Sequence, residues 1–334
     1  MAAAVTNGFH PVPPPLVPGI WAPIPTFFLP GSEDLDLPTF EAHVLRVASA
    51  GVGPVVCGSM GEAVHLSSQE RIALTRAARR VLDAADIQLP LIVGTGAAST
   101  RATLELTNDA AAAGADYAIV IPSGYYAGAL TAAALKAFFV KVSAKSPIPV
   151  FIYNYPGASG GLDMDSDLIS ELAAECPNLV GVKLTCGNVG KLTRIADSVS
   201  SFSRKNPFLV LGGFIDFVVP SAFANAHGAI TGLANFAPHA IRKLFDLSEI
   251  AKDDLALLSE AQALQGIVAR ADYTIAKTSI AGTKFLLEKM YGYGGLTRRP
   301  LPPISAAAGE ALWSHPHTQA LVAVERQLSG KISK

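Results

Sequence analysis

The chain is poor in charge. Only 16% of its 334 residues are charged, against about a quarter in an average soluble domain, whereas half are hydrophobic. This composition excludes disorder for most of the chain and requires a sizeable core. The 26 basic and 27 acidic residues give a net charge of −1 and form no basic run, which excludes the cationic surface that nucleic acid or an anionic membrane needs. A small molecule is therefore the expected partner.

Cysteine and long apolar runs are also scarce. Cys57, Cys176 and Cys186 lie far apart and include no C-x-x-C pair, which excludes a disulfide framework and a zinc cluster. No stretch reaches the roughly 20 uninterrupted apolar residues of a membrane helix. These absences predict a soluble protein in a reducing compartment, the cytoplasm. The length allows one large domain, or one domain with a smaller appendage.

The first residues are proline-rich and small, without the cationic-then-apolar pattern of a signal peptide or the arginines of a transit peptide. We expect residues 1–17 to form a flexible tail. From residue 18 onward, short apolar runs alternate with segments whose apolar residues recur every three or four positions. Strands that are apolar on both faces and joined by helices belong in a parallel sheet, and eight such units close most simply into an α/β (β/α)8 TIM barrel. We place the barrel at residues 18–235, with a doubly wound open sheet as the alternative.

The expected strands cover residues 20–26, 54–57, 91–94, 117–121, 150–153, 180–183, 208–211 and 229–232. The expected helices cover residues 37–50, 67–84, 100–113, 131–144, 165–176, 189–200 and 216–226. Beyond them only helical patterns follow, at 238–250, 254–271, 275–291 and 306–328. Residues 236–334 are therefore predicted to be a C-terminal helical region packed on the barrel.

Polar residues that end apolar strands are the first candidates for chemistry, because a barrel of this kind has its site at the carboxyl ends of the strands. Lys183 ends such a run, where burial would depress the pKa of its ammonium group and make the amine nucleophilic. The alternative is a lysine that extends from a strand end to solvent. Tyr153 ends the neighbouring strand, so its hydroxyl should lie on the same face as Lys183, although such a tyrosine is commonly only a packed ring.

A glycine-bounded turn, residues 58–62 (GSMGE), follows the second expected strand. Turns of this kind expose successive backbone N–H groups that can hold a carboxylate or phosphate, although many contain glycine for conformational reasons alone. Within it, Glu62 is expected to be a buried acceptor for loop N–H groups. Residues 94–96 (GTG) end the third strand, with no continuation to a dinucleotide or P-loop fingerprint.

Taken in order, these motifs resemble those of the N-acetylneuraminate lyase and dihydrodipicolinate synthase superfamily of Schiff-base pyruvate aldolases. Residues 58–62 resemble its G-[ST]-[TN]-G-E turn, 94–96 its G-T-G, 153–156 its Y-N-x-P, and 181–183 its G-[IV]-K with the Schiff-base lysine. Gly212 stands where the family has a glycine at the end of the seventh strand, and 228–232 (GAITG) resembles its eighth strand. The resemblance covers nearly the whole chain from about residue 18.

The resemblance implies a role for each of these residues. Lys183 would form an imine with a 2-oxo acid, and Tyr153 would carry the proton to and from the aldehyde or hydroxyl oxygen. Ser59, with its hydroxyl and N–H, and Met60, with its N–H, would hold the pyruvate carboxylate, while Ile230 and Gly212 would line the pyruvyl group. Neither a metal nor an organic cofactor is expected, because the imine is the electron sink.

The resemblance also implies a partner subunit. In the family a tyrosine from a P-x-Y-Y stretch is lent to the neighbouring site. Here that stretch is residues 122–126 (PSGYY), one residue longer, so Tyr125 and Tyr126 are alternatives. A homodimer or homotetramer is expected.

Two departures bear on the substrate. Met60 replaces a hydroxyl or amide of the family's turn, and Ala158 stands where bona fide dihydrodipicolinate synthases have an arginine for the carboxylate of aspartate semialdehyde. The sequence therefore predicts a lyase, an aldolase that cleaves or forms a 2-keto-3-deoxy acid or 4-hydroxy-2-oxoglutarate, with pyruvate and an aldehyde as partners. The alternatives are a dihydrodipicolinate synthase proper and a non-catalytic barrel that binds a 2-oxo acid.

Overall fold

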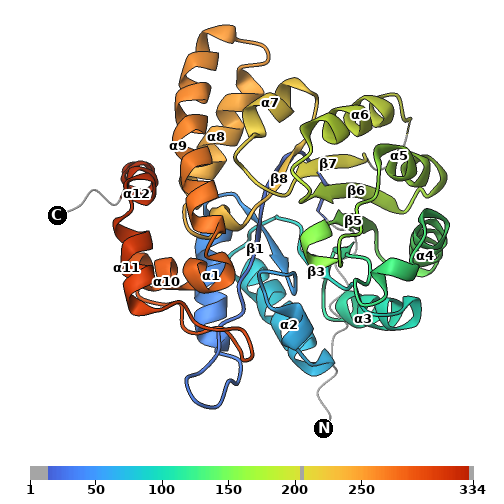
Figure 1. Ribbon diagram of the computed structural model, residues 1–334, viewed down its shortest axis with the longest axis horizontal. Coiled ribbons are helices and arrows are strands. Elements are labelled where there is room, and N and C mark those ends of the chain that lie inside the picture. The colour runs from blue at the N-terminus through green and yellow to red at the C-terminus, as the bar shows by residue number, and fades with distance from the viewer. Residues whose placement is uncertain (1–13, 204–206, 331–334) are drawn as a thin grey trace.

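Eight parallel strands close into a barrel in chain order (Figure 1), as the sequence predicts. The computed structural model describes residues 14–203 and 207–330. The alternative of a doubly wound open sheet is wrong, because β1 pairs with β8 as well as with β2. The strands are β1 Gly19–Pro23, β2 Gly53–Val56, β3 Ile92–Gly94, β4 Tyr117–Val120, β5 Val150–Asn154, β6 Leu179–Leu184, β7 Leu209–Gly212 and β8 Gly228–Ile230.

The barrel interior is filled by large side chains from alternate strand positions. Phe151 and Ile230 are fully buried there, in one apolar cluster with Tyr153 and Leu211. Gly181 makes room for this filling, because a Cβ at that position would lie 2.4 Å from the Phe151 ring. Two further clusters lie between the strands and the surrounding helices. This double burial explains why the strands are apolar on both faces.

The connecting helices follow the predicted segments closely. They are α1 Leu37–Ser49, α2 Ser68–Ala84, α3 Thr100–Ala112, α4 Ala132–Lys145, α5 Ser166–Glu175, α6 Val189–Ser200 and α7 Val218–Phe223. Helix α2 begins with a capping box, in which Ser67 accepts from the Glu70 N–H and the Glu70 side chain accepts from the Ser67 N–H. The seventh helix is shorter than the predicted 216–226, because residues 216 and 217 belong to the loop after β7 and the helix ends at Phe223.

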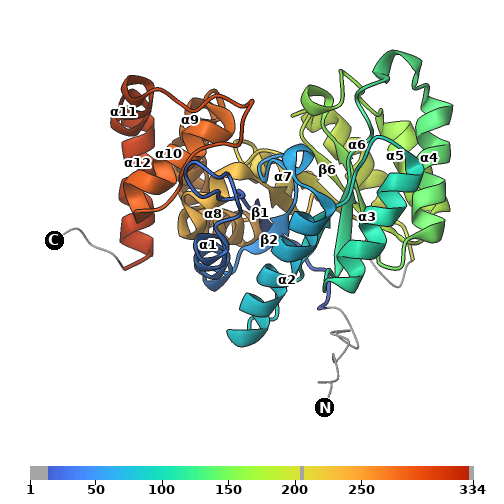
Figure 2. The same ribbon diagram turned by 90° about the horizontal axis from the view of Figure 1, so that it is seen from below.

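In the part of the chain that the structure describes, five α-helices follow β8: α8 Pro238–Ile250, α9 Leu258–Ala276, α10 Ser279–Tyr291, α11 Ala306–Ser314 and α12 Pro316–Leu328. Figures 1 and 2 show α9 to α12 gathered on one side of the barrel, beside α8. The prediction of a single helical pattern over 306–328 is wrong. His315 is extended (φ −61°, ψ 133°) and precedes Pro316, which excludes the helical conformation for His315 and starts α12 instead.

Part of the segment predicted to be a tail packs on the barrel. Leu16 is buried in the interior cluster, and the Tyr117 hydroxyl donates a hydrogen bond to the Pro14 carbonyl at 3.2 Å. Residues 1–13 lie outside the described residues. Among the helices that the structure describes, none is both long and apolar enough to cross a membrane.

Candidate active site

Lys183 and Tyr153 meet at the carboxyl ends of two paired strands. They are register partners on β6 and β5, and their side chains are 5% and 6% exposed. The Lys183 Nζ donates to the Tyr153 hydroxyl oxygen at 3.2 Å and lies 4.2 Å from the centre of the tyrosine ring. The structure thus contradicts a lysine that extends to solvent, and it gives the tyrosine a polar contact beyond packing.

The GSMGE turn, residues 58–62, brings a third group to this pair. The Ser59 Oγ lies 3.4 Å from the Tyr153 hydroxyl oxygen. The turn is closed by hydrogen bonds from the Glu62 N–H to the Ser59 carbonyl and from the Ala63 N–H to the Gly58 carbonyl. Within residues 14–203 and 207–330, the N–H groups of Ser59 and Met60 have no protein acceptor, so they are free to bind an anion.

The shape of the turn is fixed by its surroundings. Glu62 has a positive φ of 54°, a conformation that a residue with a side chain adopts only where its contacts enforce it. The Thr26 hydroxyl donates to the Gly61 carbonyl at 2.6 Å, in a buried position. Next to the turn, Gly94 must be glycine, because a Cβ there would lie 2.0 Å from the Cys57 carbonyl oxygen. This explains the glycine that begins residues 94–96.

Tyr155 supports the ring of Tyr153 from one side. The two rings are stacked, with centroids 5.7 Å apart and an interplanar angle of 22°. Burial raises the pKa of Tyr155, and the Ser159 hydroxyl donates to the Tyr155 carbonyl at 2.6 Å. Sequence reasoning gave Tyr155 no role, because its only signal was its place inside residues 153–156.

A cavity of about 270 Å³ opens beside these groups. Ser59 and Tyr153 line it from the barrel, and Ala158 lines it from the short 3-10 helix Pro156–Ala158. Its remaining wall includes Ile280 of α10 and Leu301, which the sequence did not single out. Lys183 does not line this cavity, but it contacts Tyr153, which does. Together, a buried amine, a phenol, a hydroxyl and free N–H groups form a site suited to imine chemistry on a small carboxylate.

Comparison with known proteins places this geometry in a family. The model of the dihydrodipicolinate synthetase family matches residues 43–315. The chain belongs to this family. A relative named L-threo-3-deoxy-hexylosonate aldolase, from Hypocrea jecorina, is 45% identical over 90% of this chain and 95% of its own length. A probable mitochondrial 4-hydroxy-2-oxoglutarate aldolase from Emericella nidulans is also 45% identical, over 89% and 93%.

The fold is shared with solved structures of the dihydrodipicolinate synthetase family. A putative dihydrodipicolinate synthase family protein from Coccidioides immitis superposes with a TM-score of 0.81 at 36% identity, covering 95% of this chain and 99% of that chain. The family resemblance and the closed barrel expected from the sequence are both confirmed.

The other predicted family residues lie at varying depth. Ile230 is fully buried in the barrel interior on β8. Met60 is half-buried and packs against Gly232, two residues beyond the end of β8. Gly212 ends β7 and is the register partner of Leu184 on β6. The Leu184 side chain lies in a cluster between the strands and the helices, so position 212 turns the same way and presents only backbone to the barrel interior.

Three side chains near the strand ends differ in what they can offer an aldehyde. The Ser159 hydroxyl donates to the Tyr155 carbonyl, and the Asn188 side chain caps α6 by accepting from the Lys191 N–H at 2.8 Å. The buried Oγ1 of Thr185 has no hydrogen-bond partner within the described part of the chain. Of the three side chains, Thr185 alone keeps an unpaired hydroxyl, although it does not line the cavity.

A second substrate carboxylate would need a cation, and two arginines are candidates for this role. Arg194 of α6 donates to the Ser166 hydroxyl at 2.9 Å and does not line the cavity. Arg71 does line it, but its guanidinium already donates to the Gly94 and Ala63 carbonyls. Burial lowers the pKa of Arg71. Ala158 itself brings no charge to the cavity, and the guanidinium of Arg71, which does line it, is held by two backbone carbonyls.

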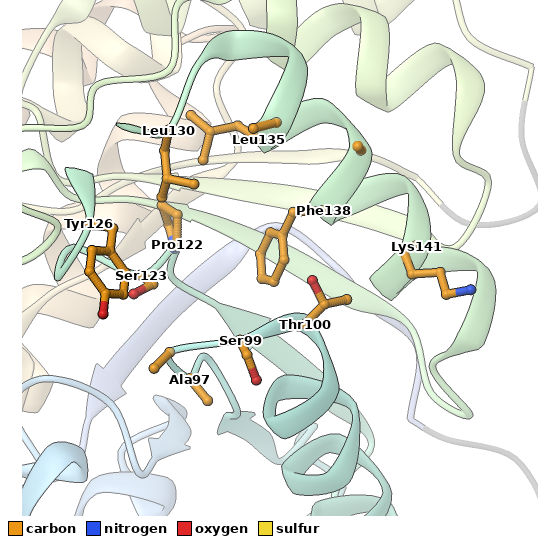
Figure 3. A pocket seen from close by; sticks show the side chains of 13 residues that line it. Ala97, Ser99, Thr100, Pro122, Ser123, Tyr126, Leu130, Leu135, Phe138 and Lys141 are labelled. Carbon is orange, nitrogen blue, oxygen red and sulfur yellow. The ribbon is translucent and has the colours of Figure 1, made fainter. Parts of the chain in front are cut away.

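Tyr125 and Tyr126 do not join the site within one subunit. They are 85% and 70% exposed, and their rings form a T-shaped pair with centroids 5.0 Å apart. Tyr126 lines a larger hollow, of about 710 Å³, between the starts of α3 and α4 (Figure 3). Phe138 of α4 points across this hollow toward Ser99 and Thr100. Neither Lys183 nor Tyr153 lines this hollow.

Proposed function

We propose that this protein is a Schiff-base aldolase that cleaves or forms a 2-keto-3-deoxy acid or 4-hydroxy-2-oxoglutarate, with pyruvate as the common partner. The observation that carries the proposal is the buried amine of Lys183 at 3.2 Å from the Tyr153 hydroxyl, beside free N–H groups of a turn. The names of the two relatives at 45% identity support the reaction class.

In the cleavage direction, the Lys183 amine adds to the C2 carbonyl of the 2-oxo acid, and loss of water leaves a protonated imine. Tyr153 then accepts the proton of the C4 hydroxyl as the C3–C4 bond breaks. The electron pair of that bond flows to the imine nitrogen and leaves an enamine, while the aldehyde departs. Protonation of the enamine at C3 and addition of water release pyruvate and restore the amine. All of the chemistry uses side chains of the protein and water.

The 2-oxo acid would be oriented by its carboxylate. The N–H groups of Ser59 and Met60 and the Ser59 hydroxyl would bind it, with Ile230 and the Gly212 backbone lining the pyruvyl group. Losing the side-chain donor that Met60 replaces leaves these backbone donors in place. The distal part of the substrate would lie in the cavity beside Ala158, with the Thr185 hydroxyl as a partner for a substrate hydroxyl.

Borohydride trapping tests whether Lys183 forms the imine. Borohydride added with pyruvate should leave a reduced adduct, and peptide mass mapping should place it on the peptide with Lys183. The buried lysines Lys191 and Lys284 serve as internal controls, because each is paired with a carboxylate and should stay unmodified. The Lys183→Met variant should give no adduct. An adduct on another lysine, or none in active protein, contradicts the proposal and favours a barrel that only binds a 2-oxo acid.

Substrate choice distinguishes the proposal from a dihydrodipicolinate synthase proper. A missing bidentate guanidinium removes a charge-assisted contact worth about 1.5–3 kcal/mol, or roughly 10- to 100-fold in affinity. The kcat/KM for 2-keto-3-deoxy acids or 4-hydroxy-2-oxoglutarate should therefore exceed that for pyruvate with aspartate semialdehyde. A panel of these acids, assayed for pyruvate release, measures this order, and faster semialdehyde condensation would show that the argument from Ala158 is wrong.

Assembly and location are further parts of the proposal. The exposed Tyr125 and Tyr126 support a homodimer or homotetramer in which one of them reaches a neighbouring site. The cytoplasm is the compartment predicted from the composition, whereas the relative from Emericella nidulans carries the word mitochondrial in its name. Fractionation of cells that produce the full chain decides between the two.

A further inference from the structure

Glu62, the last residue of the GSMGE turn, forms a fully buried ion pair with Lys284. Both side chains are 0% exposed, and the Lys284 Nζ lies 2.7 Å from the Glu62 Oε1. Lys284 belongs to α10, 222 positions further along the chain and outside the eight strand-helix units. Its Nζ also donates to the Leu296 carbonyl at 2.8 Å.

The second carboxylate oxygen of Glu62 is held from the same region. The Glu62 Oε2 accepts from the Arg298 N–H at 2.8 Å. The Arg298 guanidinium in turn donates to the His65 carbonyl and to both carboxylate oxygens of Glu70, at 3.1 and 2.6 Å. The segment between the turn and α2 is thus fastened at both ends to α10 and the loop that follows it.

The ion pair lies beside an aromatic ring. The Phe28 ring lies 4.7 Å from the Lys284 Nζ and 4.2 Å from the Arg298 guanidinium carbon. Burial lowers the pKa of Lys284, while the Glu62 carboxylate opposes this shift. A buried pair of this kind contributes little net stability over apolar residues of the same size, but removing one partner leaves an uncompensated charge. Its placement on the turn suggests a role in binding.

We propose that Lys284 is a positioning residue, which holds the GSMGE turn in place and neutralises Glu62 so that the turn can receive the carboxylate of a 2-oxo acid. This inference rests on the proposed function. Without the ammonium group, a buried carboxylate would remain on the very turn that must bind a second carboxylate. The turn would also lose the tether that helps keep Glu62 at a positive φ.

The Lys284→Met variant tests this role through the concentration of pyruvate that gives half-maximal borohydride adduct at Lys183. We expect that concentration to rise about 10-fold or more, the scale of a lost charge-assisted contact. The adduct at saturating pyruvate should still reach completion, because Lys183 and Tyr153 are unchanged. A role in stability alone would lower the melting temperature without changing the half-saturating concentration.

A double variant separates the effect of an unpaired charge on Glu62 from the effect of losing the contact that holds the turn. Glu62→Gln combined with Lys284→Met leaves no unpaired charge and keeps an acceptor for the Arg298 N–H. Its half-saturating concentration should lie between those of the wild type and Lys284→Met. If Lys284→Met does not fold, the double variant decides. A half-saturating pyruvate concentration above that of the wild type supports the proposal, and an unchanged concentration overturns it.

Arg79→Met is the matched control. Arg79 is also a buried cation, paired with Asp116 at 3.2 Å, but Asp116 precedes β4 at the amino end of the barrel. This variant should lose stability without changing pyruvate half-saturation. A wild type that gives no adduct contradicts the proposed function itself. A wild type that gives the adduct, with an unchanged value in Lys284→Met, overturns only the role of Lys284.

Discussion

At the scale of single residues, the site depends on a few side chains that contact one another. Lys183 is an amine buried among apolar residues, with a phenol as its polar neighbour. Tyr153 links it to the Ser59 hydroxyl, so that the three groups form one chain of contacts. The ring of Tyr153 is held by the stacked Tyr155, which fixes where its hydroxyl lies.

Tyr153→Phe isolates the contribution of that hydroxyl. The ring and its stacking on Tyr155 are kept, so the fold and some imine formation should survive. Turnover should fall about 10²-fold or more, the usual scale for losing a positioned acid–base group. Steady-state assays on the favoured substrate measure the fall, and borohydride trapping on the same sample is the control. Turnover close to that of the wild type would reduce Tyr153 to a packing residue.

At the scale of elements, loops after the strands are held by helices that come much later in the chain. The loop after β7 is one case. Asp272 of α9 accepts from the Ile215 N–H at 3.1 Å, and Gln265 of α9 both donates to the Ile215 carbonyl and accepts from the Val219 N–H. Helix α9 thus provides the hydrogen bonds that the backbone of this loop needs.

Asp272 makes this contact pH-dependent. Burial raises the pKa of Asp272 to about 7, and the nearby Asp216 carboxylate acts in the same direction. The folded protein therefore binds a proton more tightly here than the unfolded chain, whose aspartate ionises at a pH of about 4. Stability from this group is present below that pH and is lost as the pH rises through about 7.

Asp272→Asn removes the ionisation and keeps an acceptor for Ile215. Relative to the wild type, the free energy of unfolding of the variant should rise by about 2–4 kcal/mol between pH 4 and pH 8. Urea unfolding at the two pH values measures this difference. Asp253→Asn, at an exposed position, is the control and should show no such change. If the difference in the free energy of unfolding between variant and wild type is the same at pH 4 and pH 8, Asp272 does not ionise in this range.

At the scale of the whole molecule, one subunit presents an incomplete set of the predicted site residues. The amine, the phenol and the carboxylate turn are in place, whereas Tyr125 and Tyr126 lie exposed next to the hollow between α3 and α4. A tyrosine lent to a neighbouring site would make activity a property of the assembly.

Assemblies that mix two inactive variants test whether a tyrosine is lent to the neighbouring site. Tyr125→Phe and Tyr126→Phe, made separately, should identify the residue that is needed, since only one should lower turnover strongly. Subunits of that variant, exchanged with the inactive Lys183→Met, should recover part of the wild-type turnover. The reason is that a mixed pair contains one site with both an intact lysine and an intact lent tyrosine. No recovery in assemblies shown by mass to be mixed would mean that neither tyrosine is lent.

The sequence by itself determined the closed barrel and the two strand ends at which Lys183 and Tyr153 meet. Both depend on local patterns: strands apolar on two faces predict a parallel sheet, and Lys183 and Tyr153 are recognised because each ends such a run. The split at Pro316 was missed because the flanking segments share one helical period. The tertiary structure alone decided which side chains meet across long separations. Glu62 and Lys284, 222 residues apart, carry no pattern that links them, and only the folding of the C-terminal helices onto the barrel makes them a buried pair.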